Sequence, residues 1–267
     1  MQVVSVRGEA VPLSWFGAHG APRLLFLHGY ARHPLDYRLG LEAVAAEGYQ
    51  IVAPFLFANH GLRRPPTSFW AAAALGRRTY EALLRAGELA PESGVFGHST
   101  GGAVALTLGA LTSPPPAILA INPVQPSDRH VLSFVLSSGW MNTKLALGRA
   151  GDGRLGRLVL RESGPRFYAN WLRDPRRGLA LIEGLTRYTY PRLLRWFGGQ
   201  RNTATRARAL YGAGDEFYPT SDGLLDGLSR VFERAEVRQL DGENSHEWLM
   251  IRPTRLADEV AQFFRAV

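Results

Sequence analysis

The chain has 267 residues, of which 46% are hydrophobic and 20% charged, and it carries a formal net charge of +8. A chain of this length and apolar content can bury a large core, which excludes an intrinsically disordered protein. The absence of cysteine excludes disulfides, thiol catalysis and thiolate metal sites.

The predicted elements begin with a hairpin and continue as strands that alternate with helices. In chain order we expect a hairpin at 3–15, a strand at 23–28, a helix at 35–47, a strand at 49–53, a helix at 68–86 capped by Thr67, a strand at 94–96, a helix at 100–111, and strands at 117–121 and 208–211, then a helix at 221–232, a strand at 236–240 and a helix at 254–264. Apolar strands alternating with helices are typical of a mostly parallel sheet with helices on both faces. The sequence therefore predicts the α/β class.

Residues 127–205 interrupt this alternation. They carry 14 Lys and Arg residues against 5 Asp and Glu residues, so the surplus positive charge of the chain lies here. We expect a helical cap inserted into an α/β core that comprises residues 1–126 and 206–267. Arginines mixed with aromatic residues could bind single-stranded nucleic acid, but no RNP, KH or zinc-finger pattern is present. We therefore expect no nucleic-acid partner and interpret the arginines mainly as solubilising residues.

We expect the protein to be cytoplasmic and to have no transmembrane segment. No stretch reaches the roughly 18 uninterrupted apolar residues that a membrane span requires. The first twenty residues lack a basic head followed by an apolar run, so we expect no secretory signal.

The most informative motif is Gly97-His98-Ser99-Thr100-Gly101, between a predicted strand and a predicted helix. In that setting G-x-S-x-G predicts a nucleophile elbow, a tight turn that lifts the serine hydroxyl from the edge of the sheet. Glycines two residues before and after the serine let the neighbouring backbone approach closely. The motif alone is also compatible with an ordinary glycine-rich turn.

A serine hydroxyl becomes a good nucleophile only beside a base that a carboxylate orients. Asp215 follows the strand predicted at 208–211, and His246 follows the strand predicted at 236–240. The carboxyl ends of parallel strands share one edge of a sheet, so we expect Ser99, Asp215 and His246 to meet there. Asp128 is an alternative acid, but only Asp215 lies in a G-x-x-D-x-x-x-P sequence.

A tetrahedral intermediate also needs backbone N–H donors, and we expect those of Thr100 and Tyr30 to form the oxyanion hole. No cofactor and no metal is expected. Residues 151–156 match G-x-G-x-x-G, but no strand-like run precedes them and no acidic residue follows at the distance that a dinucleotide site requires.

These motifs resemble those of the alpha/beta-hydrolase superfamily. The matching pieces cover about residues 22–125 and 206–264, and they are LLFLHGY, the loop from Ala53-Pro54 to Asn59-His60-Gly61, GHSTGG, GAGDEFYP and the His246 loop. The resemblance implies Ser99 as nucleophile, Asp215 as acid and His246 as base, with the Tyr30 and Thr100 amides as the oxyanion hole. It also implies a cap or lid between the two halves.

The resemblance further implies structural roles for His28 and His98. Phe55 stands where many members carry an aspartate, which affects subfamily assignment rather than the triad. A serine at position 99 disfavours the haloalkane dehalogenases and the epoxide hydrolases of the superfamily.

We predict a cofactor-independent serine hydrolase, a carboxylesterase that acts on small to medium acyl esters. The arginines of the insertion make an anionic ester one option. The same triad could serve thioester, amide or lactone hydrolysis, C–C bond cleavage or perhydrolysis, and the fold could instead serve as a non-catalytic ligand receptor.

Overall fold

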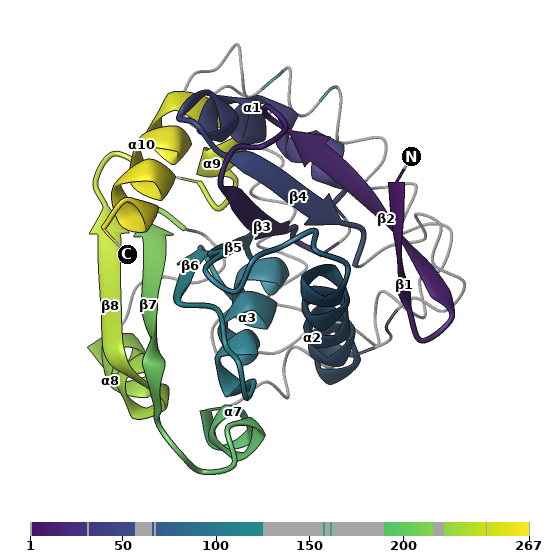
Figure 1. Ribbon diagram of the computed structural model, residues 1–267. Coiled ribbons are helices and arrows are strands. Elements are labelled where there is room, and N and C mark those ends of the chain that lie inside the picture. Colours follow the sequence, from purple (N-terminus) through teal and green to yellow (C-terminus); the bar gives the residue numbers. More distant parts are fainter. Residues whose placement is uncertain are drawn as a thin grey trace.

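The computed structural model describes residues 2–30, 32–56, 66, 68–124, 157, 161, 190–215, 222–243 and 245–266. The strands are β1 (Gln2–Val6), β2 (Glu9–Phe16), β3 (Arg23–Leu27), β4 (Gln50–Pro54), β5 (Val95–His98), β6 (Ala117–Ile121), β7 (Asn202–Gly212) and β8 (Phe232–Leu240). They form one sheet in the order β1-β2-β4-β3-β5-β6-β7-β8 (Figure 1).

Helices cover both faces of this sheet (Figure 1). They are η1 (Pro34–Tyr37) and η2 (Leu108–Ala110), which are 3-10 turns, and α1 (Arg38–Ala46), α2 (Phe69–Arg85), α3 (Thr100–Thr107), α7 (Tyr190–Trp196), α8 (Asp222–Val231), α9 (Trp248–Ile251) and α10 (Pro253–Phe264). Side chains of α1, α9 and α10 pack into the core on one face, and those of α2, α3 and α8 pack into the core on the other. The predicted α/β class, with a mostly parallel sheet, is confirmed.

The register of the parallel strands aligns their carboxyl ends. Strands β1 and β2 are antiparallel, as are β2 and β4, and the other neighbouring pairs are parallel. His98 at the end of β5 pairs with Ile121, Ile121 pairs with Leu210, and Gly212 pairs with Leu240. The segments after β5, β6, β7 and β8 therefore leave the same edge of the sheet.

Three local differences from the prediction have clear causes. Strand β7 begins at Asn202, inside the segment predicted as cap, because Asn202 already pairs with Phe232 of β8; an irregularity separates this pair from the regular pairing that starts at Arg206. The cap of α2 is Ser68, one residue after the predicted Thr67, and its Oγ accepts from the Ala71 amide (3.2 Å). Helix α9 was not predicted, because its four buried apolar residues are too short a run to show a helical period.

Most of the predicted cap, residues 127–205, lies outside the described residues, as do Thr67, Asp128 and residues 151–156. At its C-terminal end, α7 packs against the core: the Trp196 ring stacks on Trp70 of α2, with ring centroids 5.1 Å apart, and its Nε1 donates to Thr107 O (3.2 Å). The division of the chain into core and cap stays a prediction. None of the described helices combines the length and the apolar character that crossing a bilayer requires.

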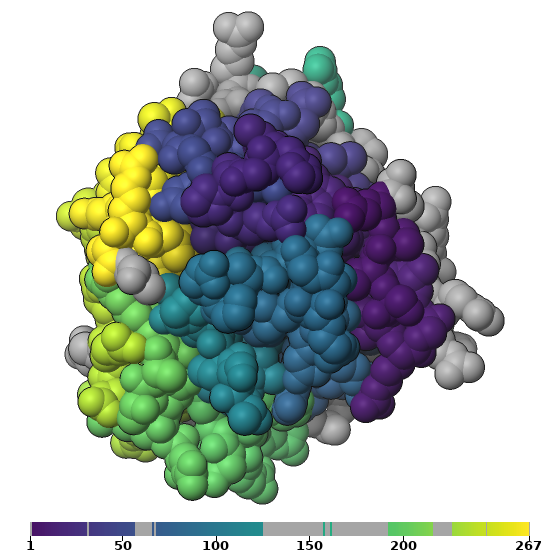
Figure 2. All heavy atoms as spheres, viewed as in Figure 1, coloured from purple at the N-terminus to yellow at the C-terminus, as the bar shows by residue number. Residues whose placement is uncertain are grey.

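The hairpin extends the sheet beside the helical layer. Strand β1 contacts α2, and the two segments lie side by side on the face of the molecule shown in Figure 2, the hairpin in purple and α2 in blue. The hairpin thus covers part of the α2 surface at the edge of the sheet away from β7 and β8.

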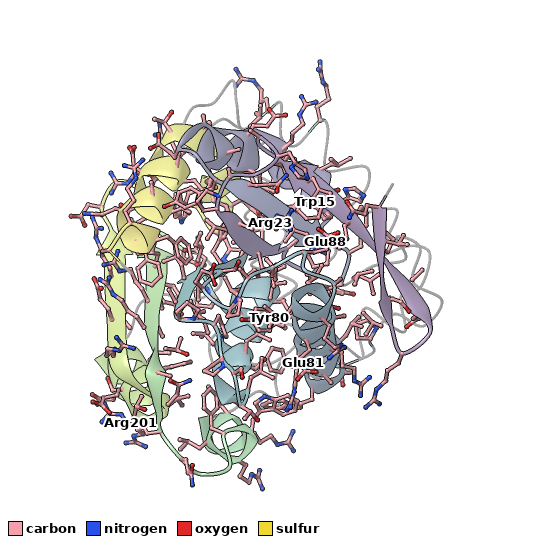
Figure 3. The ribbon with its side chains drawn as sticks, viewed as in Figure 1. Trp15, Arg23, Tyr80, Glu81, Glu88 and Arg201 are labelled. Carbon is pink, nitrogen blue, oxygen red and sulfur yellow. The ribbon has the colours of Figure 1, made fainter. Side chains whose placement is uncertain are left out.

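Arg23, the first residue of β3, makes several contacts at the edge of the sheet where the parallel strands begin. Its guanidinium bonds Gln50 Oε1 (2.9 Å), Gly87 O (2.9 Å) and Glu88 Oε2 (3.3 Å), and it lies over the Trp15 ring; Figure 3 shows Trp15, Arg23 and Glu88 together. A cavity of about 730 Å³ opens at this edge. It lies at the start of the parallel strands, opposite the edge that carries Ser99, Asp215 and His246, so it is not the candidate active site.

Candidate active site

Ser99 lies in a strained turn between β5 and α3. Its backbone has φ 54° and ψ −121°, a conformation that a residue with a side chain rarely adopts. The turn is held on both sides, because the Ser99 amide donates to Ile121 O (2.9 Å) and its carbonyl accepts from the Ala103 amide (3.0 Å). The side chain is partly exposed. This is the geometry that the nucleophile-elbow motif predicts.

The two glycines of the motif are required by close backbone approach. A Cβ on Gly97 would lie 2.6 Å from Gly101 O, and a Cβ on Gly101 would overlap the carbonyl oxygens of Leu27 and His28. Both contacts are with backbone, which cannot rotate away as a side chain can. The turn can therefore form only because positions 97 and 101 have no side chain.

Asp215 and His246, which are separate in the sequence, are in direct contact. His246 Nδ1 lies 2.9 Å from Asp215 Oδ2, and both side chains are buried. The two loops are joined by backbone as well, since the Gly214 amide donates to Glu243 O (3.0 Å). A buried carboxylate in this position orients the imidazole and favours a proton on Nδ1.

The loop of His246 is also bonded to the residue before Ser99. His98 Nε2 donates to the His246 carbonyl (3.0 Å), and the two rings have centroids 4.8 Å apart. Asp215 and His246 thus lie against the Ser99 turn. The contact between Ser99 Oγ and His246 Nε2 stays a prediction.

His98 is a buried, neutral histidine whose tautomer follows from its partners. Because a carbonyl only accepts, Nε2 carries the proton, and Nδ1 then accepts from the Tyr37 hydroxyl (2.9 Å). That hydroxyl accepts in turn from the Gly29 amide (3.0 Å). Burial lowers the pKa of His98 from 6.5 to about 4, and burial raises the pKa of Tyr37 well above 10.0. The chain of hydrogen bonds links the β3 loop to the His246 loop.

This buried histidine predicts a specific pH dependence of stability. Between pH 6.5 and about 4 the unfolded chain binds a proton at His98 and the folded protein does not, so the free energy of unfolding falls as the pH falls through that range. We expect His98 to account for a loss of about 2.5 kcal/mol between pH 7 and pH 4.5. Urea unfolding at about pH 7 and about pH 4.5 measures it.

A His98→Gln variant is the matched control, because glutamine keeps one donor and one acceptor but does not titrate. Its unfolding free energy should fall less between the two pH values, by the amount that His98 contributes. If the unfolding free energy fell equally in the wild type and the variant, His98 would be protonated in the folded protein at about pH 4.5, and the prediction would be wrong.

Asn122, directly after β6, joins the segments that lead to Asp215 and His246. Its Nδ2 donates to the His246 carbonyl (2.8 Å), and its Oδ1 accepts from the Gly212 amide (3.1 Å) and from Trp248 Nε1 (3.3 Å). The residue is fully buried and has φ 41°, a conformation that asparagine tolerates better than most residues. Asn122 therefore fixes the backbone on which His246 sits.

The predicted oxyanion donors lie on the two segments next to Ser99. Thr100 is the first residue of α3, where amides have no acceptor within the helix. Tyr30 follows Gly29, and a Cβ on Gly29 would lie 3.3 Å from Ser99 Cβ, so the β3 loop passes beside the turn. Binding of an oxyanion by these two amides stays a prediction.

His28, directly after β3, also stabilises the loop that contains Gly29 and Tyr30. Its Nδ1 donates to Gly29 O (2.9 Å), and its Nε2 accepts from the Leu56 amide (3.1 Å). These bonds to backbone fit the structural role that the resemblance implies.

Four residues that support the site were not identified from the sequence: Arg32, Tyr37, Asn122 and Glu247. Asn122 could have been found, because it is a polar residue directly after a buried strand, like Ser99. Arg32 and Glu247 form a buried ion pair (2.9 Å) between the β3 loop and the residue after His246. Nothing local in the sequence distinguishes these two charges from surface charges.

Comparisons with known proteins agree with this architecture. The family model described as "Alpha/beta hydrolase family" matches residues 24–259. No curated protein matches the sequence.

Several solved structures are similar to the chain at low sequence identity. Epoxide hydrolase I of potato (Solanum tuberosum) has a TM-score of 0.70 and 16% identity, over 100% of this chain and 99% of that one. A putative lipase of Acinetobacter baumannii has a TM-score of 0.70 and 16% identity, over 99% and 90%. The thioesterase domain from the curacin biosynthetic pathway has a TM-score of 0.63 and 16% identity, over 97% and 98%. At these identities the likeness shows a shared fold.

Proposed function

The chain belongs to the alpha/beta hydrolase family, and from that premise we propose that it is a serine hydrolase that cleaves carboxylic esters through an acyl-enzyme. In this proposal Ser99 is the nucleophile, His246 the general base and Asp215 the residue that orients the base. The observation that carries the proposal is the 2.9 Å contact of His246 Nδ1 with Asp215 Oδ2, on loops packed against the strained Ser99 turn.

The first half of the reaction is acylation. Ser99 Oγ attacks the acyl carbon while its proton passes to His246 Nε2, and Asp215 stabilises the imidazolium that forms. The carbonyl oxygen becomes an oxyanion, which the amides of Tyr30 and Thr100 stabilise; one such donor is typically worth about 2.7–4 kcal/mol. The C–O bond to the alcohol then breaks, and His246 gives its proton to the departing oxygen.

The second half repeats these steps with water. A water molecule loses a proton to His246 and attacks the acyl-enzyme, and the bond to Ser99 Oγ breaks as that oxygen takes the proton back. The products are the alcohol and the carboxylic acid. Because an imidazolium cannot accept a proton, activity falls as His246 becomes protonated at low pH.

The serine at position 99 supports acyl substrates over epoxides, although epoxide hydrolases are among the structural neighbours. Two other neighbours, described as a thioesterase domain and a putative lipase, are acyl hydrolases by those descriptions. We propose small to medium acyl esters, with the basic segment 127–205 as the cap that selects among them.

A fluorophosphonate probe tests the proposal, because it forms a stable adduct only with an activated serine. We expect stoichiometric labelling, with the adduct on the peptide that contains Ser99, and saturable turnover of aryl esters from a series of increasing acyl length. The same acyl groups presented as thioesters separate an esterase from a thioesterase. Tight binding of esters without labelling or turnover would contradict the proposal and identify a receptor instead.

A further inference from the structure

A buried ion pair lies behind the candidate active site. Arg32 Nη2 and Glu247 Oε1 are 2.9 Å apart, and the two side chains are 4% and 5% exposed. Glu247 Oε2 is buried too and accepts no hydrogen bond from the described residues. Desolvating two charges often costs more than their attraction returns, so a pair in which one oxygen has no partner among the described residues is not explained by a gain in stability.

The ion pair connects the loop after β3 with the loop that contains His246, and the proposed chemistry requires these two loops to keep a fixed relative position. The Arg32 amide donates to Gly29 O (3.2 Å), which closes the turn that contains Tyr30. Glu247 follows His246 directly, and its carbonyl accepts from the Met250 amide (3.0 Å) at the start of α9. The ion pair therefore fastens the turn that carries one predicted oxyanion donor to the loop that carries the predicted base.

Charged and titratable groups from several elements surround the ion pair and His246. They are Asp215 after β7, His98 at the end of β5, Asp36 and Tyr37 of η1, Arg32 after β3 and Glu247 beside His246 itself. Burial alone would raise the pKa of Glu247, but Arg32, His98 and His246 bring it below 4.5, so the carboxylate is ionised at neutral pH. The Glu247 carboxylate interacts electrostatically with His246, and the Arg32 cation, 2.9 Å from that carboxylate, offsets its negative charge.

We propose that Arg32 and Glu247 are positioning residues: their ion pair holds the Tyr30 turn against the His246 loop, and their opposite charges cancel beside the His246 ring. The catalytic meaning of this inference rests on the proposed function. The charge balance itself can be measured without turnover.

The first experiment follows the His246 ring by NMR titration, with its signals identified by their loss in His246→Ala. Glu247→Gln removes the anion and leaves the permanent Arg32 cation, so we expect the pKa of His246 to fall by about one unit. Adding Arg32→Met removes the cation as well and should return this pKa to within a few tenths of its wild-type value. The matched control is Glu259→Gln, because Glu259 is also buried and ion-paired, with Arg238 (2.8 Å), but lies on α10; it should leave the pKa of His246 unchanged.

The second measurement is the steady-state kinetics of ester hydrolysis. In the double variant Arg32→Met/Glu247→Gln we expect kcat to fall about tenfold or more and KM to change by less than about twofold, because an oxyanion donor acts in the transition state. Glu259→Gln should keep the wild-type kcat and KM.

The outcomes separate the two proposals. An unchanged pKa of His246 in Glu247→Gln, or wild-type kcat and KM in the double variant, would overturn the role of the pair. If Glu247→Gln fails to fold, the double variant decides, since it buries no unpaired charge. Absence of ester turnover in the wild-type protein would refute the proposed function. The NMR titration of His246 would still show whether the charges of Arg32 and Glu247 offset one another.

Discussion

Replacing Ser99 or His246 by alanine is expected to lower kcat for ester hydrolysis by about 10⁶-fold, and replacing both should lower it no further. The two residues act on one proton, so that removing either one disables the other. The residual rate should come from substrate binding and from oxyanion donors that do not depend on the triad. Steady-state rates of the two single variants and the double variant on one aryl ester test this.

Exposed residues of the same type provide matched controls. Ser113→Ala and His19→Ala change side chains at the surface and should keep the wild-type kcat. If the losses in the single variants multiplied in the double variant, the serine and the histidine would act independently, and the proton-transfer line proposed here would be wrong.

The part of the site that could be predicted consists of polar residues in the loops that follow predicted strands. The Gly-x-Ser-x-Gly spacing indicates a turn in which backbone segments approach closely, and the overlaps at Gly97 and Gly101 explain why. Asp215 follows β7 and His246 follows β8, two further strands of the same parallel sheet, whose carboxyl ends must share one edge. Topology alone was enough to expect that these three residues lie at one edge.

The supporting residues could not be predicted, because their partners are set only by the tertiary fold. Arg32 and Glu247 are 215 positions apart, and each looks like an ordinary charged residue until the loops are folded together. His98 was expected to be structural, but the sequence does not show that it bonds Tyr37 on one side and the His246 carbonyl on the other. Local chemistry therefore identifies candidate reacting groups, whereas the groups that orient them emerge from packing.

The predicted boundaries of helices and strands were wrong where neighbouring residues are similarly suited to begin the element. Thr67 and Ser68 are both good helix caps, and the extended backbone at Ser68 decides between them. Strand β7 starts early because Asn202 pairs with Phe232 of β8 and its side chain accepts from the Ala204 and Thr205 amides across the irregularity that follows, which an apolar pattern does not reveal.

Asp215→Asn is expected to lower kcat by about 10⁴-fold at neutral pH while the fold is retained. The Asp215 carboxylate accepts the Nδ1 proton of His246, which leaves the lone pair on Nε2 free for the Ser99 proton. An asparagine can instead donate its amide to Nδ1, and the ring proton then occupies Nε2, where the base is needed. Rates on an aryl ester, with urea unfolding as the check on folding, measure the effect.

Asp128→Asn is the decisive control for this assignment, because Asp128 follows β6 and is the alternative acid in the sequence. Asp128 lies outside the described residues, whereas Asp215 is buried and bonded to His246. If Asp215 orients His246, Asp128→Asn should keep a wild-type kcat. The opposite pattern, a large loss for Asp128→Asn and a small one for Asp215→Asn, would mean that the buried Asp215–His246 contact only holds the loops together and that the acting acid comes from the β6 side of the sheet.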